Sequence, residues 1–333
     1  MDVRKIQVTG GSSYMVTLPK EWAEKVGLKK NAPVGLQPQP DGSLIIYPAD
    51  ADSIQAHSLK TIDATHVDDL VLFYRRLIGA YIAGHTTIEI RSDTELDTQV
   101  ANVTSNFVQN AIGLEILEED ETHITIKDLI NQDELRPIKS VERMKILVRN
   151  MLNDVLNALD KKDPKYLAEM DNRDREVDRL NWLIARQVNI HQKDITISRR
   201  QGADLITITR CGIISKTIER IGDHAIVLSN NLRSLIDDDS TNLVDEEIVA
   251  TGRAVVTLFS DSVATWVAKN MDSANDCLAR GENLVQKSIS ISKMSENLSG
   301  KGALAARIIS ESVKRVAEYS MDISEMTINA AME

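Results

Sequence analysis

The feature that most constrains the fold of this chain is an acidic pair that occurs twice inside long helical patterns. Glu219 and Asp223 are four residues apart, and Glu318 and Asp322 repeat that spacing 99 residues later. Residues at positions i and i+4 of a helix lie on one face, so each pair brings two like charges together. A cation, a neighbouring Lys or Arg, or water must offset that repulsion. The repeat also predicts that the C-terminal two thirds of the chain is one structural unit used twice.

The C-terminal part of the sequence predicts six helices. From about Ser140 onward, apolar residues recur at spacings of three and four, which is the period of an amphipathic helix. Charged or glycine-containing breaks define helices over 140–160, 164–190, 203–236, 244–270, 275–298 and 302–330. The acidic run that ends at Ser240 divides them into three and three. This pattern predicts two three-helix bundles, over residues 138–237 and 243–331.

Residues 1–50 predict a small β-rich module. The expected strands cover 3–8, 14–18, 32–37 and 43–47, and Asp41-Gly42 is the expected turn of the second hairpin. Pro19 suits the first turn of a short helix, and Gly27 suits its end. A module of this size cannot bury enough apolar surface by itself, so we expect it to pair with a second chain.

Residues 61–130 predict a small α/β segment between the module and the bundles. The patterns indicate helices over 66–83 and 96–112, a strand over 86–91, and a hairpin formed by 114–117 and 123–126. The acidic run 118–121 is the solvated turn of that hairpin. The whole chain is therefore expected to be an α+β multidomain protein with an all-α C-terminal part.

Composition and charge limit the class of protein. Aromatic residues make up only 4% of the chain, and the two cysteines, Cys211 and Cys277, lack the spacing of a zinc site or a disulfide framework. The sequence contains neither a run of 18 apolar residues nor a leader pattern, so we expect a cytoplasmic protein that does not insert into membranes. Residues 1–50 hold six basic and five acidic side chains, whereas the remainder holds 33 and 45. The acidic remainder should repel nucleic acid and attract cations.

Residues 140–330 resemble the PhoU family of phosphate-signalling regulators. The segment from Lys216 to Ala225 matches the signature of that family's third helix. Asp174 and Asp178 match its acidic motif on the second helix, and the pair at 318 and 322, preceded by Arg315, matches the second copy. The resemblance implies a protein that senses phosphate status and restrains phosphate uptake. It also implies partners, either a phosphate transporter ATPase or a signalling protein.

The second bundle departs from the family pattern at one position. By distance from the preceding helix break, Glu282 and Gln286 correspond to Asp174 and Asp178, so an amide replaces one acid. Asp272 and Asp276 keep the spacing but stand at an expected helix start, where Asp is common as a cap. We therefore expect the second bundle to bind metal more weakly than the first, or not at all.

The acidic pairs have two interpretations. In the first, Asp174 and Asp178 on one helix face Glu219 and Asp223 on the next, and the four carboxylates bind a hard cation such as Fe³⁺, Mg²⁺ or Mn²⁺. The PhoU resemblance implies the same site, occupied by an iron or zinc cluster. In the second, each pair is a solvated face neutralised by nearby Lys or Arg. The candidate ligands are Asp174, Asp178, Glu219, Asp223, Glu318, Asp322 and Glu282.

Residues 2–48 resemble the AbrB/SpoVT swapped-hairpin family. The resemblance is carried by the segment from Val8 to Lys20, by the short helix that follows, and by the strands after it. It implies an intertwined homodimer, and many members bind DNA. Arg4, Lys5 and Lys20 are the candidate contacts to DNA phosphates. The alternative is a dimerisation module without DNA binding, since its basic excess is small. An AbrB-like module joined to PhoU-like bundles resembles the archaeal members of the PhoU group.

The sequence favours a regulator over an enzyme. It contains no Glu-x-x-His motif of the di-iron carboxylate enzymes, no nucleophile–histidine pattern, no phosphate loop and no dinucleotide fingerprint. Two alternatives remain. One is an AbrB-type DNA-binding transcription regulator or antitoxin unrelated to phosphate, and the other is a metal-dependent enzyme.

Overall fold

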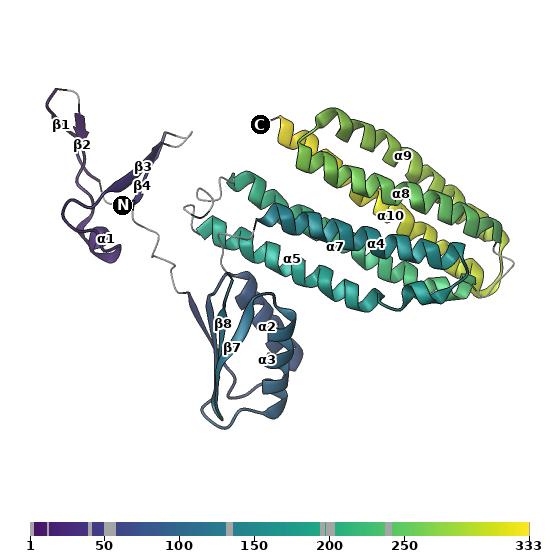
Figure 1. The fold of residues 1–333 in the computed structure, drawn as a ribbon, viewed down its shortest axis with the longest axis horizontal. Helices are drawn as coiled ribbons and strands as arrows, with labels where there is room; N and C mark the ends of the chain where they lie inside the picture. Colours follow the sequence, from purple (N-terminus) through teal and green to yellow (C-terminus); the bar gives the residue numbers. More distant parts are fainter. Residues whose placement is uncertain are drawn as a thin grey trace. The chain divides into compact units, whose positions relative to one another are not determined.

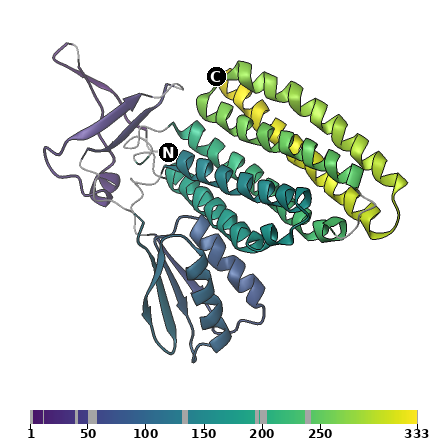
Figure 2. The same cartoon turned by 45° about the vertical axis from the view of Figure 1, so that its right-hand side comes forward.

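The structure is a computed structural model that divides the chain into two units, Met1–His57 and Ser58–Glu333 (Figures 1 and 2). It describes residues 3–11, 13–38, 42–49, 58–130, 136–193, 197, 204–236 and 242–332. In the described part of the chain, no helix is long and apolar enough to cross a membrane.

The first unit consists of two antiparallel hairpins and a short helix. Strand β1 (Gln7–Thr9) pairs with β2 (Ser13–Met15), and β3 (Val34–Pro38) pairs with β4 (Leu44–Pro48). Helix α1 (Lys20–Lys25) follows Pro19 and ends before Gly27, which has a φ of +70°. The predicted strand–helix–strand order is confirmed, although β1 and β2 are shorter than expected. Asp41, expected in the second turn, lies outside the described residues.

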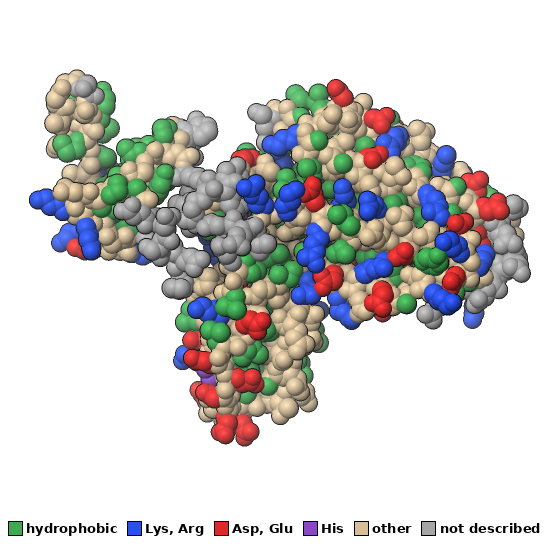
Figure 3. Space-filling model, viewed as in Figure 1, with side chains coloured by type: hydrophobic (Ala, Val, Ile, Leu, Met, Phe, Trp, Pro, Cys, Tyr) green, Lys and Arg blue, Asp and Glu red, His purple; other side chains and the backbone are tan. Residues whose placement is uncertain are grey.

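None of the residues described in the first unit is buried. Instead, large apolar side chains of both hairpins and the segments beside them are exposed, and Figure 3 shows apolar surface over this unit. The exposed residues include Val3, Ile6, Val8, Tyr14, Met15, Val16, Leu36 and Leu44. The unit therefore lacks the core that would stabilise it as an isolated monomer.

The second unit begins with a four-stranded mixed sheet. Its strands are β5 (Leu59–Asp63), β6 (Thr87–Arg91), β7 (Leu114–Glu119) and β8 (His123–Asp128), in the order β5-β6-β8-β7. Only β5 and β6 are parallel, joined through helix α2 (Leu70–Ile82). Helix α3 (Thr98–Asn110) connects β6 to β7, and both helices lie on the same face of the sheet (Figure 1).

The sheet core follows from alternation along the strands. Ile88 and Ile90 on β6, and Ile124 and Ile126 on β8, are fully buried, because every second side chain of a strand points to the same face. They pack in one cluster with the buried aromatic and leucine side chains of α2 and α3. The acidic turn at 118–121 is exposed as expected, and Figure 3 shows acidic side chains gathered at that end of the sheet.

Two predictions in this segment were wrong in their details. The helix expected from residue 66 begins only at Leu70, because the Asp69 side chain caps it by accepting a hydrogen bond from the Leu72 N–H. Asp97 shortens the next helix in the same way. Strand β5 was not predicted at all, since only Ile62 of its five residues is buried and the strand has no alternating pattern.

The six long helices are confirmed, with starts and ends that differ from the expected ones by at most six residues (Figure 1). They are α4 (Pro137–Asp160), α5 (Met170–Lys193), α7 (Leu205–Ile236), α8 (Asn242–Ala268), α9 (Met271–Met294) and α10 (Gly300–Ala331), with a short 3₁₀ helix at Pro164–Leu167. The two three-helix halves share one hydrophobic core, because α4 packs on α8 and α7 packs on α10. At Gly252 on α8 the approach is so close that an added Cβ would lie 2.5 Å from Leu156 Cδ2.

A buried arginine joins the sheet segment to the bundle. Arg186 of α5 is fully buried, and its Nη2 atom donates hydrogen bonds to Asp128 Oδ2 at 2.6 Å and to the His85 carbonyl at 2.9 Å. Its Nη1 atom donates to the carbonyl of Tyr81, and its guanidinium lies 4.8 Å from the centre of the Tyr81 ring. Asn189 adds a bond to the Ile82 carbonyl at 3.0 Å. Side chains of α5 therefore satisfy carbonyls that the end of α2 leaves without helical partners.

Replacing this arginine tests how far the second unit depends on it. We expect Arg186→Met to lower the free energy of unfolding by about 3–5 kcal/mol, because the Asp128 carboxylate stays buried without this guanidinium. Urea unfolding followed by circular dichroism measures the change.

The matched control is Lys193→Met. Lys193 lies one α5 turn beyond Asn189 and donates to the carbonyl of Ala83, the residue after α2, but its side chain is exposed. We expect that variant to lose less than about 1 kcal/mol. Equal losses of unfolding free energy in the two variants would show that burial of the Arg186 charge does not determine its contribution to stability.

Candidate functional site

The acidic residues of the first bundle lie where two helices make close contact. Asp174 and Asp178 belong to α5, and Glu219 and Asp223 belong to α7. Gly222 of α7 lies at this contact, where an added Cβ would be in ordinary van der Waals contact with α5, 3.6 Å from Val177 Cγ1 and 4.0 Å from Asp174 Oδ1. The structure therefore brings the two sequence motifs onto adjoining helix faces.

Three of the four carboxylates in this cluster have raised pKa values. Burial, together with the charges of Asp174, Glu219 and Asp223, raises the pKa of Asp178 to about 6. Burial and the charge of Glu219 also raise the pKa values of Asp174 and Asp223. Like charges that are partly removed from water destabilise one another, so this cluster would gain from a cation.

One lysine already neutralises part of the cluster. Lys216 Nζ donates to both carboxylate oxygens of Glu219 at 2.6 Å, and its charge lowers the pKa values of Asp178 and Asp223. As the described side chains stand, no three His, Cys, Asp or Glu residues form a group that could hold a metal ion. The oxygen donors suit a hard cation in their chemistry, and Lys216 competes with such a cation for Glu219.

The second bundle holds a corresponding set in which an amide replaces one acid and Glu325 lines the same cavity. Glu282 and Gln286 of α9 line one cavity of about 510 Å³ together with Glu318 and Asp322 of α10. Burial and the charges of Glu325 and Glu318 raise the pKa of Asp322. Arg315 donates to Glu318 at 2.9 Å. The amide at position 286 therefore faces the acid pair, as the sequence comparison between the two halves suggests.

The alternative pair in the second half lies elsewhere. Asp272 and Asp276 line a different surface cavity, and Asp276 pairs with Arg280 at 3.4 Å. Asp272 lies in the first turn of α9, as expected of a helix start, but the cap itself is Asn270, whose side chain accepts from the Ser273 N–H.

Two residues of the signature segment connect the bundles, which the sequence did not indicate. The ring of His224 on α7 lies 5.9 Å from the ring of Tyr319 on α10. The guanidinium of Arg220 lies 6.0 Å from the same ring, and its charge lowers the pKa values of both Asp223 and Asp322. Arg220 therefore acts on the acidic pairs of both bundles.

The candidate DNA contacts are all exposed in the first unit. Arg4 and Lys5 precede β1, and Lys20 opens α1. Lys20 Nζ lies 3.6 Å from Glu24 Oε1 one turn along the helix, and both side chains are exposed. Exposed ion pairs of this kind are weak and leave the lysine available to another anion.

Comparisons with known proteins agree with this architecture. Residues 141–232 match the family described as "PhoU domain", and residues 7–53 match "Antidote-toxin recognition MazE, bacterial antitoxin". The solved structure of PhoU from Pseudomonas aeruginosa superposes with a TM-score of 0.51 and 19% identity, over 58% of this chain and 94% of that one. No curated protein matches the chain.

A second solved structure is the phosphate transport system regulatory protein PhoU from Streptococcus pneumoniae. Its TM-score is 0.47 and its identity 19%, over 57% of this chain and 90% of that one. The class that the fold and the family matches define is a helical-bundle protein with an N-terminal module of the AbrB and MazE type. More particularly, α5 and most of α4 and α7 lie within the stretch that matches the PhoU domain. The expected archaeal origin stays a prediction.

The charge cluster generates a test that needs no metal. In a chelating buffer, we expect Asp178→Asn to unfold at a higher temperature than the original protein near neutral pH, because it removes a half-buried charge facing three others. A pKa above the unfolded value means that the folded state binds more protons, so this carboxyl costs stability as the pH rises through about 6.

The advantage of the variant should accordingly shrink as the pH falls and vanish below about pH 4. Thermal unfolding across this pH range measures it. The control is Asp93→Asn, at an exposed position in the sheet segment, which should leave the unfolding temperature unchanged. A constant advantage for Asp178→Asn at every pH would show that the charge is not its cause.

Proposed function

We propose that this chain is a non-enzymatic regulator of phosphate homeostasis. The observation that carries the proposal is that the PhoU domain match covers the helices that bring Asp174, Asp178, Glu219 and Asp223 together. In this proposal the bundles contact a phosphate transporter ATPase or a signalling protein and restrain phosphate uptake.

The cluster on α5 and α7 is, in this proposal, the cation site of the regulator. Its donors are carboxylate oxygens, which favour Fe³⁺, Mg²⁺ or Mn²⁺. Iron and zinc clusters are the ions that the family resemblance implies. The second bundle binds more weakly, because Gln286 offers a neutral amide and Arg315 holds Glu318.

Removing one acidic pair tests both the cation site and the function. We expect the double variant Glu219→Ala/Asp223→Ala to lose most of the metal that the original protein retains when purified without chelator or nickel. Elemental analysis of the two proteins measures this. The matched control is Glu246→Ala/Glu247→Ala, which removes two exposed acids from α8 and should keep its metal.

The same variants are then tested in cells. Deleting the gene should raise phosphate uptake in phosphate-rich medium. Reintroducing the original gene or the control variant should return uptake to its level before the deletion. The Glu219→Ala/Asp223→Ala variant should fail to do so. Unchanged uptake in the deletion strain would overturn the proposed function, whatever the metal content. Full metal in the variant would overturn only the cation site.

We also propose that the first unit forms a homodimer that binds duplex DNA. The support is its exposed apolar surface, the absence of buried residues in its described part, and its match to a family of antitoxins. Two copies double the number of basic side chains that face the phosphates, and binding strength scales with the phosphates neutralised. This is also the observation that favours the second candidate, a transcription regulator or antitoxin unrelated to phosphate.

Substitutions in the first unit test the dimer and DNA binding. We expect Leu36→Asp to convert a dimer into a monomer by light scattering, because it places a charge in the proposed interface. We expect Arg4→Ala/Lys5→Ala to leave the dimer intact but to weaken DNA retardation and flatten its salt dependence. Lys301→Ala, a basic position in α10, is the control. If the original protein is a monomer, the proposed dimer is wrong. If it retards no DNA at low salt, the proposed DNA binding is wrong.

A further inference from the structure

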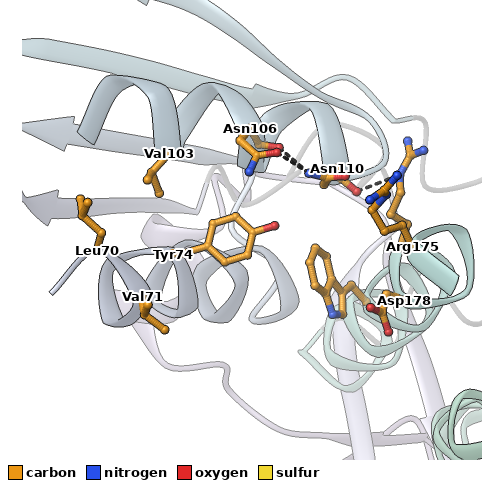
Figure 4. A pocket seen from close by; sticks show the side chains of 10 residues that line it. Leu70, Val71, Tyr74, Val103, Asn106, Asn110, Arg175 and Asp178 are labelled. Atoms are coloured by element: carbon orange, nitrogen blue, oxygen red, sulfur yellow. Dashed lines mark hydrogen bonds between the residues drawn. The ribbon is translucent and has the colours of Figure 1, made fainter. Parts of the chain in front are cut away.

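One cavity that no motif predicted lies between the sheet segment and the first bundle. It has a volume of about 560 Å³ and is formed by α2, α3 and α5 (Figure 4). This volume falls within the usual range for small-molecule sites, which is roughly 300–1,000 Å³. Two of its walls are held together, because Arg186 and Asn189 of α5 donate hydrogen bonds to carbonyls at the end of α2.

One part of the cavity wall is aromatic and aliphatic. Tyr74 of α2 and Trp182 of α5 meet edge to face, with ring centres 6.5 Å apart and planes at 67°. Leu70, Val71 and Val103 extend this wall from α2 and α3. Val71 is 59% exposed, so the apolar wall is open to solvent rather than closed by the core. Such a surface offers a planar ring a place to stack.

The polar groups of the cavity have distinct roles. Arg179 is already engaged by the Asn110 carbonyl at 2.9 Å and by Glu176, so it fixes the wall. Arg175 donates a side-chain hydrogen bond to the neutral amide of Asn172, and within the described part of the chain its guanidinium forms no ion pair. Asn106 contributes an exposed amide from α3, across the cavity from α5. Its Oδ1 atom accepts a hydrogen bond from Asn110 Nδ2 at 2.7 Å.

We propose that this cavity binds a mononucleotide. Its base stacks on the Tyr74 and Trp182 rings, its phosphate pairs with the Arg175 guanidinium, and the Asp178 carboxylate accepts a hydrogen bond from a base N–H. Inorganic phosphate alone would leave the apolar wall unused, and a purely apolar ligand would leave Arg175 and Asp178 unused. A heteroaromatic ring that carries an anionic group uses both. The inference goes beyond the proposed function and does not depend on it.

Calorimetric titration of the full chain in chelating buffer tests the site. The probes are adenosine monophosphate, guanosine monophosphate, adenosine and inorganic phosphate. We expect at least one monophosphate to bind, and adenosine and inorganic phosphate each to bind at least about tenfold more weakly. Quenching of tryptophan fluorescence by the same monophosphate provides a second readout.

Two exposed substitutions locate the site without disturbing a core. Arg175→Gln should weaken binding of the monophosphate about tenfold, because it removes a charge-assisted bond. Val71→Glu should abolish binding by placing a charge on the stacking wall. Arg307→Gln, an exposed arginine of α10, is the matched control and should bind normally. Thermal unfolding confirms that each variant is folded.

The outcomes separate the proposal from its rivals. No binding of either monophosphate at millimolar concentration overturns it. Inorganic phosphate that binds as tightly as the monophosphates would show a plain anion site and also overturns it. Adenosine that binds equally well would show that Arg175 does not hold a phosphate. Normal binding by both Arg175→Gln and Val71→Glu would place the ligand elsewhere and overturn the assignment.

Discussion

The buried guanidinium of Arg186 is the interaction on which the arrangement of the second unit depends. Removing this charge from water is costly, and the ion pair with Asp128 and the carbonyls of Tyr81 and His85 offset the cost only in one geometry. That geometry fixes the end of α2 against α5. Because α5 also carries Asp174, Asp178, Arg175 and Trp182, the same contact positions the acidic cluster and the cavity beside it.

Charge balance explains why the two bundles are similar in fold and different in the sites they offer. In the first, four carboxylates lie in one another's field, and Lys216 is bonded to only one of them. In the second, an amide replaces one acid, and Lys314 and Arg315 both approach Glu318. Arg220 reaches toward both sets from between them. The uncompensated charge that would attract a cation is therefore concentrated in the first bundle.

The sequence predicted the long helices well and the contacts between elements poorly, for a physical reason. Helix periodicity and charged breaks are local, so the six long helices could be assigned from neighbouring residues alone. Arg186 follows the polar pattern of an exposed position, and nothing local indicates that Asp128, 58 residues earlier, covers it. Strand β5 has only one buried residue and no alternation. The cavity walls at Leu70, Asn106 and Asp178 belong to three separate helices, so no motif could contain them.

Asp178 belongs to both the cavity and the acidic cluster, so the proposed mononucleotide and the proposed cation would compete for the same carboxylate. A carboxylate that accepts a hydrogen bond from a base has less charge available for a cation, and a cation-bound carboxylate is a poorer acceptor. The coupling free energy between two sites is reciprocal, so each ligand would weaken the other by the same factor. The buried Arg186 makes such coupling effective, because α2 and α5 cannot move apart to relieve it. The sheet segment, to which the sequence assigned no role, would then be the part through which a small molecule controls the cation content of the first bundle.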